Sequence, residues 1–367
     1  MRIAEVKLKT EIKEFLDLPA RIYCDDPHYI EHIRSDIEAV FDPKQNKAFI
    51  NGTARRWIAL NENGECTGRI AAFYQDKRSK RFGGWGFFDA FERDTAEMLI
   101  KHAEDWLKEN DCKQIQAPVN FGSRDSYWGL RIKADSAPSY QENYHQEVYQ
   151  QWIEDMGYER EIEQTTYEIS HQEFNFDRFS NISQRTLKNG DYRFVSLDYS
   201  RINQFARDFV EIYNQAWSFH DDFEPLEEKE LLARFKEMKA AVISETIIFA
   251  YHQERPIGFF VNILEINQVF KDFNGELTLW NKLRYLFRRG QIDRLKGLVF
   301  GVIPDYHNKG VEAGMIMKLY REALKLNNYK VMELSWIGDF NPKMLSMLKS
   351  LGARLIKTHH TYLKKFS

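Results

Sequence analysis

The 367-residue chain has little cysteine and no long apolar run, and each shortage excludes a class of protein. Its three cysteines, Cys24, Cys66 and Cys112, are an odd number without metal-ligand spacing, which argues against a disulfide framework and a zinc site. The first residues, MRIAEVKLKTEIKEF, predict no signal peptide, and no later stretch is apolar for long enough to insert into a membrane. We therefore expect a cytoplasmic protein that needs no metal.

Glycine, proline and net charge are also low. The chain has 19 glycines and 9 prolines, too few for a fibrous or disordered protein, and 43% hydrophobic residues, as in folded globular proteins. Its 52 basic and 55 acidic residues give a net charge of -3, so we expect no nucleic-acid partner. Because single cores stop growing at about 300 residues, a chain of this length predicts two domains.

The order of predicted elements is the same in both halves. The first half alternates apolar and turn residues in a pattern that predicts strands at 56–60, 68–73 and 85–91, a helix at 95–110, a strand at 113–120, a helix at 142–155 and a strand at 164–169. The second half predicts strands at 246–251, 258–264 and 297–303, a helix at 311–327, a strand at 331–337, a helix at 342–351 and a strand at 354–362.

This repeated order predicts an α/β (α+β) fold. Each half is expected to form a mixed, mostly antiparallel sheet flanked by helices, whose later strands run parallel across a helical crossover. The stretch 170–183 breaks the periodicity, and 192–197 resembles an opening strand. We therefore predict an N-terminal domain of residues 1–175 and a C-terminal domain of residues 176–367.

One segment of the second half carries chemistry. Residues 299–303 are apolar, Pro304 to Lys309 form a short polar turn, and Gly310 precedes a predicted helix. Such a turn aims free backbone N–H groups and the positive end of a helix dipole at one point, which suits a pyrophosphate. Lys309 adds a positive charge there.

This segment resembles the acetyl-CoA pyrophosphate loop of the GNAT (GCN5-related N-acetyltransferase) superfamily. The family pattern has Arg or Gln, two residues, Gly, one residue, then Gly or Ala; here His307 takes the first place, Gly310 matches, and Glu312 stands at the last. Residues 334–353 resemble the strand-helix-strand unit that follows, although Leu348 stands where the family often has a tyrosine acid. The whole chain resembles uncharacterised bacterial tandem GNAT-like proteins, and its N-terminal half lacks a phosphate loop.

The resemblance implies acetyl-CoA or another acyl-CoA as co-substrate. It places the binding residues on the loop, the helix start and the turn after the next strand: Val302, Ile303, His307, Asn308, Lys309, Gly310, Val311, Glu312, Ala313 and Asn341.

The sequence names no secure catalytic residue, but four side chains are candidates. Alternation places Glu333 and Ser335 on one face of the strand beside the presumed CoA cleft, where either could bind an amine. His220, close to Asp222, could deprotonate an amine, and Tyr149 lies on the predicted helix at 142–155. Each of the four also suits an ordinary core, capping or solvated position.

The connection between the predicted strands at 258–264 and 297–303 is too long for a hairpin. Residues 275–291 place leucine, tyrosine and phenylalanine among lysine and arginine, which predicts an inserted basic amphipathic helix. We expect this helix to pack over the junction of the two domains, with a membrane-surface or anionic-substrate role as the alternative.

Three functions agree with these features. The leading hypothesis is an acyl-CoA-dependent N-acyltransferase that uses its C-terminal domain to acetylate a small-molecule or peptide amine. The alternative is a catalytically silent GNAT-fold protein that binds a ligand or partner, which Glu312 and Leu348 favour. A further alternative, an aminoacyl-tRNA-dependent peptide-bridge transferase, depends on the basic residues between Lys282 and Arg294.

Overall fold

The computed structural model describes residues 1–77, 80–218, 225–237, 241–326 and 328–366. The first half contains strands β1 (Arg2–Glu5), β2 (Gly52–Leu60), β3 (Cys66–Lys77), β4 (Lys80–Ala90), β5 (Gln114–Ala117), β6 (Leu130–Ala134) and β7 (Glu159–Ser170). Its helices are α1 (Lys9–Ile22), α2 (Arg34–Val40), α3 (Arg93–Glu109) and α4 (Val148–Asp155).

The second half begins with helix α5 (Phe176–Lys188), inside the stretch where the sequence shows no clear periodicity. Its strands are β8 (Tyr192–Ser196), β9 (Ile248–His252), β10 (Arg255–Leu264), β11 (Arg294–Val302), β12 (Val331–Gly338) and β13 (Arg354–Lys365). Its further helices are α6 (Ile202–Trp217), α7 (Glu228–Glu237), α8 (Asn267–Phe270), α9 (Leu279–Arg288), α10 (Val311–Leu326) and α11 (Pro342–Leu351).

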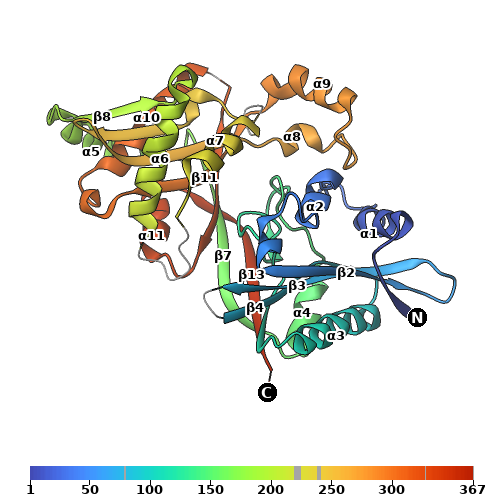
Figure 1. Ribbon diagram of the computed structural model, residues 1–367. Coiled ribbons are helices and arrows are strands. Elements are labelled where there is room, and N and C mark those ends of the chain that lie inside the picture. Colours follow the sequence, from blue (N-terminus) through green and yellow to red (C-terminus); the bar gives the residue numbers. More distant parts are fainter. Residues whose placement is uncertain (78–79, 219–224, 238–240, 327, 367) are drawn as a thin grey trace.

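The strands form one continuous sheet in the order β1-β2-β3-β4-β5-β13-β7-β12-β11-β10-β9-β8, with β6 beside β13. The pairs β4–β5 and β11–β12 are parallel, and the other pairs are antiparallel. Helices cover the sheet (Figure 1). The expected fold class, a mixed and mostly antiparallel sheet flanked by helices in each half, is confirmed.

The two halves exchange their last strands. β7 ends the first half of the chain but pairs with β12, whereas β13 ends the chain and pairs with β5. Figure 1 shows β7 and β13 side by side where the two lobes meet. Tyr362 of β13 is buried in the core of the first half, and Tyr167 of β7 packs in the core of the second. A boundary at residue 175 therefore divides the chain by sequence order, whereas the sheet is continuous across both halves.

Local chemistry explains where the first predicted hairpin turns. The backbone N–H of Asn61 donates to the carbonyl of Glu65 at 3.0 Å, and the Asn61 side-chain oxygen accepts from the N–H of Glu65 at 2.9 Å. Gly64 takes φ 81°, a conformation that glycine adopts without strain. The turn thus closes β2 on β3 as the sequence predicts.

The helix predicted at 142–155 is shorter in the structure, where α4 begins at Val148. The preceding residues make long-range contacts instead of helical ones. Glu142 pairs with Lys357 at 2.8 Å, and the Asn143 side-chain amide donates to the carbonyl of Gly129 at 2.9 Å. These tertiary contacts override the local helical pattern.

Candidate active site

The strands β11 and β12 separate part-way along their length. They pair in parallel from Arg294 and Val331 to Gly297 and Leu334, and the pairing ends there. Beyond that point, β10 holds β11 as far as Val302, and β7 holds β12 through Gly338. The facing edges therefore carry backbone N–H and C=O groups that the two strands do not use for each other, and a ligand could bind to them.

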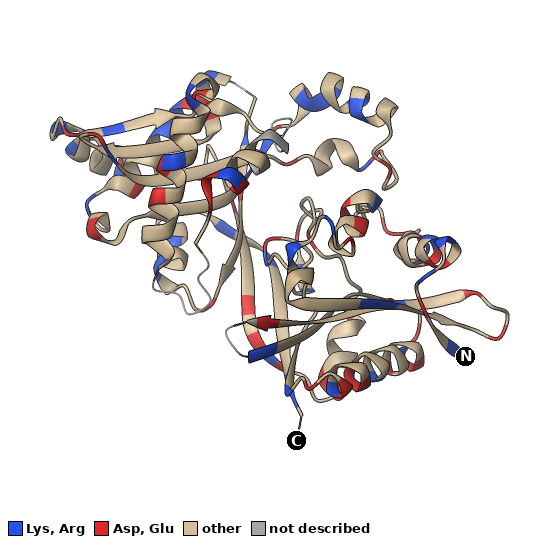
Figure 2. Ribbon diagram, in the orientation of Figure 1, with Lys and Arg blue, Asp and Glu red and all other residues tan. Residues whose placement is uncertain are grey.

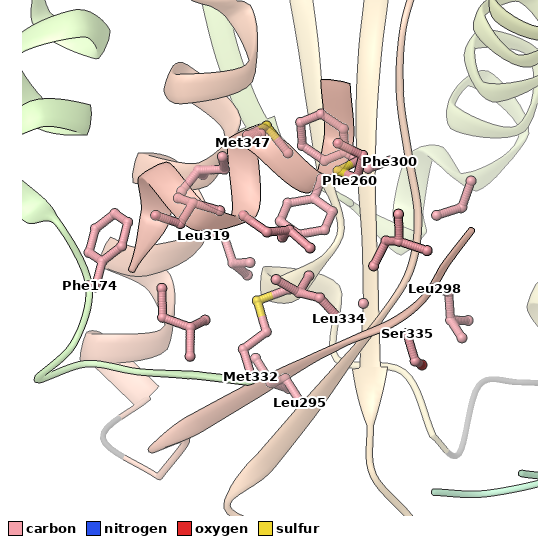
Figure 3. Close-up of a pocket in the computed structure, with 18 of the residues that line it drawn as sticks. Phe174, Phe260, Leu295, Leu298, Phe300, Leu319, Met332, Leu334, Ser335 and Met347 are labelled. Carbon is pink, nitrogen blue, oxygen red and sulfur yellow. The ribbon is translucent and has the colours of Figure 1, made fainter. Parts of the chain in front are cut away.

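A cavity of about 310 Å³ lies at this separation. The side chains of β11, β12, α10 and α11 line it, together with the segment that follows β7. Most are apolar, and they include Leu295, Phe300, Leu319, Met332, Leu334 and Met347 (Figure 3). The volume is at the lower end of the range of ligand pockets, about 300–1,000 Å³, and the lining suits an apolar ligand.

Few polar side chains reach the cavity. Those that do include His171, Tyr320, Ser335 and Asn341. The rings of His171 and Tyr320 lie 5.3 Å apart, and burial lowers the pKa of His171, which favours the neutral imidazole. Asn341 caps α11 through its side-chain oxygen, which accepts from the N–H of Met344 at 3.2 Å.

Of the four catalytic candidates predicted from the sequence, Ser335 lines the cavity and Glu333 does not. The expectation that both residues share one site on a common face is therefore corrected. The pairing of β12 with β7 is irregular between Leu334 and Ile337, so the simple alternation of a regular strand does not extend through Ser335.

Tyr149 is buried in the first half of the chain, away from the residues that line the cavity. Its hydroxyl donates to the carbonyl of Ala90 at 2.7 Å and accepts from the N–H of Ala90 at 2.9 Å. These bonds give the phenol a structural role on β4. His220 lies outside the described residues.

His171 and Tyr320 are not among the site residues that the sequence predicts. A histidine two residues after the predicted strand at 164–169 and a tyrosine in the middle of the predicted helix at 311–327 are the signals that could have drawn attention to them. Neither signal is specific, because which strand or helix lies opposite depends on the tertiary structure.

The predicted phosphate loop forms a short turn before α10. Asn308 and Gly310 have φ values of 61° and 81°, and every residue of the turn except Tyr306 is exposed, including His307, Asn308 and Lys309. The His307 ring folds back, and its Nε2 lies 2.9 Å from the carbonyl of Val302 and donates to it. The first N–H groups of α10, at Val311, Glu312 and Ala313, have no acceptor among the described residues. The turn thus leaves donors available at a helix N-terminus.

Gly310 has a packing role in this turn. A Cβ atom at this position would lie 2.2 Å from the hydroxyl oxygen of Thr186 on α5. The Thr186 hydroxyl also lies 3.3 Å from the carbonyl of Lys309, to which it donates. The glycine that matches the family pattern is therefore required by the contact with α5 and by its positive φ.

The other predicted binding residues divide into buried and partly exposed positions. Val302, Ile303, Val311 and Ala313 are buried, and the N–H of Ile303 donates to the carbonyl of Ile257. These side chains belong to the hydrophobic core of the second half, on which the turn lies. Glu312 is half-buried in the first turn of α10 and forms no ion pair in the part of the chain that the structure describes.

Glu333 instead belongs to a buried ionic cluster that joins the two halves. Lys357 Nζ lies 2.8 Å from Glu142 Oε2 and 3.2 Å from Glu333 Oε2, and the Ser139 hydroxyl donates to Glu333. Burial opposes ionisation of Glu142, but Lys357 outweighs it and lowers the pKa to about 2. Burial lowers the pKa of Lys357, whereas Glu142 and Glu333 raise it above its usual value. Glu142 and Lys357 are therefore ionised, and the cluster links first-half loops to β12 and β13.

The corresponding position in the first half is closed. The N–H of Val119 donates to the carbonyl of Trp85 at 2.8 Å, and a Cβ on Gly86 would lie 2.1 Å from the oxygen of Val119. A cavity of only about 10 Å³ is found in this half, beside the buried pair Arg69 and Asp89. The cavity of about 310 Å³ therefore lies in the second half, at the separation of β11 and β12, where the first half keeps its strands together.

The described part of the chain has neither a membrane-spanning helix nor a metal-binding cluster. No helix there combines the length and the apolar character needed to cross a bilayer. No group of three or more His, Cys, Asp or Glu side chains has the arrangement of a metal site, again within those residues.

Comparison with known proteins identifies the fold. No protein-family profile matches the chain. The tandem GNAT protein from the clavulanic acid biosynthesis pathway superposes with a TM-score of 0.58, at 11% identity, over 99% of this chain and 98% of its own. The chain has the tandem GNAT fold. A second solved structure is that of a GCN5-related glucosamine N-acetyltransferase region in a fungal multi-domain GH3 beta-N-acetylglucosaminidase. It superposes on 99% of this chain with a TM-score of 0.60 at 10% identity, and the match covers 38% of its own chain.

Two curated relatives are similar over nearly their whole length. Protein YghO of Escherichia coli is 24% identical over 97% of this chain and 93% of its own. The bacterial ceramide synthase of Caulobacter vibrioides is 25% identical over 99% of this chain and 97% of its own.

Proposed function

We propose that this protein is an acyl-CoA-dependent N-acyltransferase that binds a long-chain acyl thioester between β11 and β12 of its C-terminal half. The observation that carries the proposal is the apolar cavity of about 310 Å³ where these strands separate. An acetyl group is far smaller than this space, whereas the chain of a fatty acyl group would bury its methylenes against the leucine, methionine and phenylalanine side chains.

The relatives support the same class of substrate. The name of the Caulobacter relative denotes synthesis of a ceramide, which is the amide of a fatty acid and a long-chain amino alcohol. We infer that the acceptor of this protein is likewise the primary amine of a lipid.

The residues present could hold a CoA thioester. The free edges of β11 and β12 offer N–H and C=O groups to the two amides of the pantetheine arm. The open N–H groups at the start of α10, with Lys309, suit the pyrophosphate. Glu312 acts against binding there because it adds a negative charge beside the phosphates.

The reaction is an attack by the amine nitrogen on the thioester carbonyl carbon. The C–N bond forms, the C–S bond breaks, and the sulfur leaves as a thiolate that takes up a proton. Backbone N–H groups on the edge of β11 could polarise the carbonyl, and neutral His171 is the candidate to accept the proton that the amine loses. Leu348 lines the cavity at the position where the family often has a tyrosine acid, and its side chain cannot supply a proton.

A transfer assay tests this proposal. The full chain is incubated with sphinganine and acyl-CoA of two to eighteen carbons, release of the free CoA thiol is followed, and the amide is identified by mass spectrometry. We expect long-chain acyl-CoA to give amide and acetyl-CoA to give little. A His171→Gln variant should release thiol at least tenfold more slowly with unchanged acyl-CoA binding. The absence of amide from every acyl-CoA, with sphinganine and with simple alkylamines, would refute the proposal.

A binding measurement on the same protein sample distinguishes the catalytically silent alternative from the enzyme. Glu312 and Leu348 are the residues that favour it, since each departs from the family pattern. Equilibrium binding of acyl-CoA without thiol release, over a panel of lipid and peptide amines, would establish a binding protein instead of an enzyme.

A further inference from the structure

Helix α9 has an apolar face that the rest of the protein does not cover. Leu279, Trp280 and Phe287 are 81%, 69% and 85% exposed, and Leu283 and Leu286 are also exposed. At 100° per residue these five side chains lie within about 120° of the helix circumference, so they form one stripe. The sequence predicts that this helix packs over the junction of the two domains. That prediction is wrong for the stripe, because its five side chains are exposed.

The opposite side of α9 anchors the helix to the protein. Asn281 and Tyr285 are buried, and the Asn281 amide donates to the carbonyl of Glu276 at 2.7 Å. The connection before α9 does reach the first half, where the N–H of Arg34 donates to the carbonyl of Gly275 at 2.9 Å. Figure 1 shows α9 beyond α8, on the side of α8 that faces away from α1 and α2. The stripe is therefore held in a fixed direction, pointing away from the protein.

Positive charge borders the stripe on both sides. Between Leu279 and Gln291 the chain has four cations, Lys282, Arg284, Arg288 and Arg289, and no acidic residue. Asp272 pairs with Arg288 at 2.6 Å, while Lys282 and Arg289 form no ion pair with any described residue. Figure 2 shows this basic character along α9.

We propose that α9 docks the protein on the surface of a membrane that contains anionic phospholipids. Aromatic and leucine side chains flanked by lysine and arginine are the composition of helices that lie in the plane of a bilayer surface. The apolar stripe would enter the headgroup region, and the bordering cations would meet the lipid phosphates. The proposal is independent of the transferase function and concerns the location of the protein.

Vesicle sedimentation tests the docking. The full chain is mixed with vesicles of phosphatidylcholine alone or of equal parts phosphatidylcholine and phosphatidylglycerol, in 0.1 M salt. We expect at least tenfold stronger partitioning to the anionic vesicles, which falls when the salt is raised to 0.5 M.

Two paired variants and one control identify the surface. Trp280→Ser with Phe287→Ser should reduce partitioning at least tenfold, and Lys282→Gln with Arg289→Gln should remove most of the preference for anionic lipid. Ile50→Ser is the matched control, because Ile50 is 84% exposed in the first half, and it should bind as the native protein does. Failure of the native protein to bind anionic vesicles, or equal binding by the Trp280 and Phe287 variant, would overturn the proposal. Light scattering that shows a dimer lost in that variant would assign the stripe to a second copy instead.

Discussion

Gly297 of β11 and Leu334 of β12 are the last residues that pair before the two parallel strands diverge. A Cβ on Gly297 would lie 2.9 Å from the Leu334 side chain, so glycine allows the strands to approach at the point where the cleft begins. The apolar cavity, the open strand edges and the turn before α10 are all arranged around this divergence.

Filling the cavity should change the chain length that the protein accepts. Ala323 of α10 is buried and lines the cavity, so Ala323→Phe places a ring where an acyl chain would lie. We expect kcat/KM for a sixteen-carbon acyl-CoA to fall at least tenfold, while a four-carbon acyl-CoA changes less than about threefold. Ala323→Ser, which leaves the space nearly unchanged, is the control. An equal loss for both chain lengths would contradict the placement of the acyl chain.

Neutralising Glu312 should strengthen binding of a CoA thioester. Its carboxylate lies in the first turn of α10, where phosphates would meet it as a like charge. We expect Glu312→Gln to lower Kd about three- to tenfold in low salt, with a smaller effect in 0.5 M salt because of screening. Glu62→Gln, an exposed change of the same charge in the first half, should have no effect. Weaker binding by the Glu312 variant would place the phosphates elsewhere.

Removing the central cation of the buried cluster should destabilise the whole protein. Lys357→Met leaves Glu142 and Glu333 buried without their partner, and such a change costs about 3–5 kcal/mol. Lys330→Met removes an exposed lysine 3.6 Å from Asp293 and should cost less than about 1 kcal/mol. Urea denaturation measures both changes in the free energy of unfolding. A small effect at Lys357 would show that the cluster does not hold the halves together.

Buried histidines should make the protein less stable in mild acid. Burial lowers the pKa of His32 to about 4 and also lowers the pKa values of His145 and His359. The folded state therefore binds fewer protons than the unfolded state below pH 6.5. The free energy of unfolding is therefore highest above pH 6.5, where these histidines are neutral in both states. It decreases by about 1.4 kcal/mol per pH unit for each histidine as the pH falls toward the lowered pKa values.

Denaturation in urea between pH 7.5 and 5 measures this slope. Glu142 does not contribute in this window, because its stabilising effect is lost only below about pH 4.5. His145→Gln should reduce the slope by the contribution of one histidine. The variant should still fold, since a glutamine oxygen can accept from the N–H of Arg131 as the His145 ring does. The exposed His28→Gln variant should leave it unchanged. Stability that is constant between pH 6.5 and 5 would contradict the assignment.

Much of the fold follows from local patterns in the sequence. The strands β2, β3, β9, β10, β11 and β12 and the helices α3, α10 and α11 lie where alternation or helical spacing predicts them. The exchange of β7 and β13 does not follow from such patterns. Which strand pairs with β13 depends on the edges that the other strands leave open, and these exist only in the folded chain.

The site was predictable only in part. The turn before α10 has the open donors that its sequence indicates, but the reason for Gly310 is a contact with Thr186, which is more than a hundred residues away. The separation of Glu333 from Ser335 depends on an irregular pairing with β7. The cavity itself arises where two strands diverge, and no local pattern in the sequence of either strand predicts this divergence.

Photolabelling with a long-chain acyl-CoA that carries a diazirine near the end of its acyl chain tests whether the acyl chain lies between β11 and β12. We predict that mass spectrometry finds the adducts on the residues of β11, β12, α10 and α11 that line the cavity, and that an excess of unlabelled acyl-CoA abolishes them. Adducts confined to the first half or to the stripe of α9, or adducts that the competitor does not reduce, would contradict it.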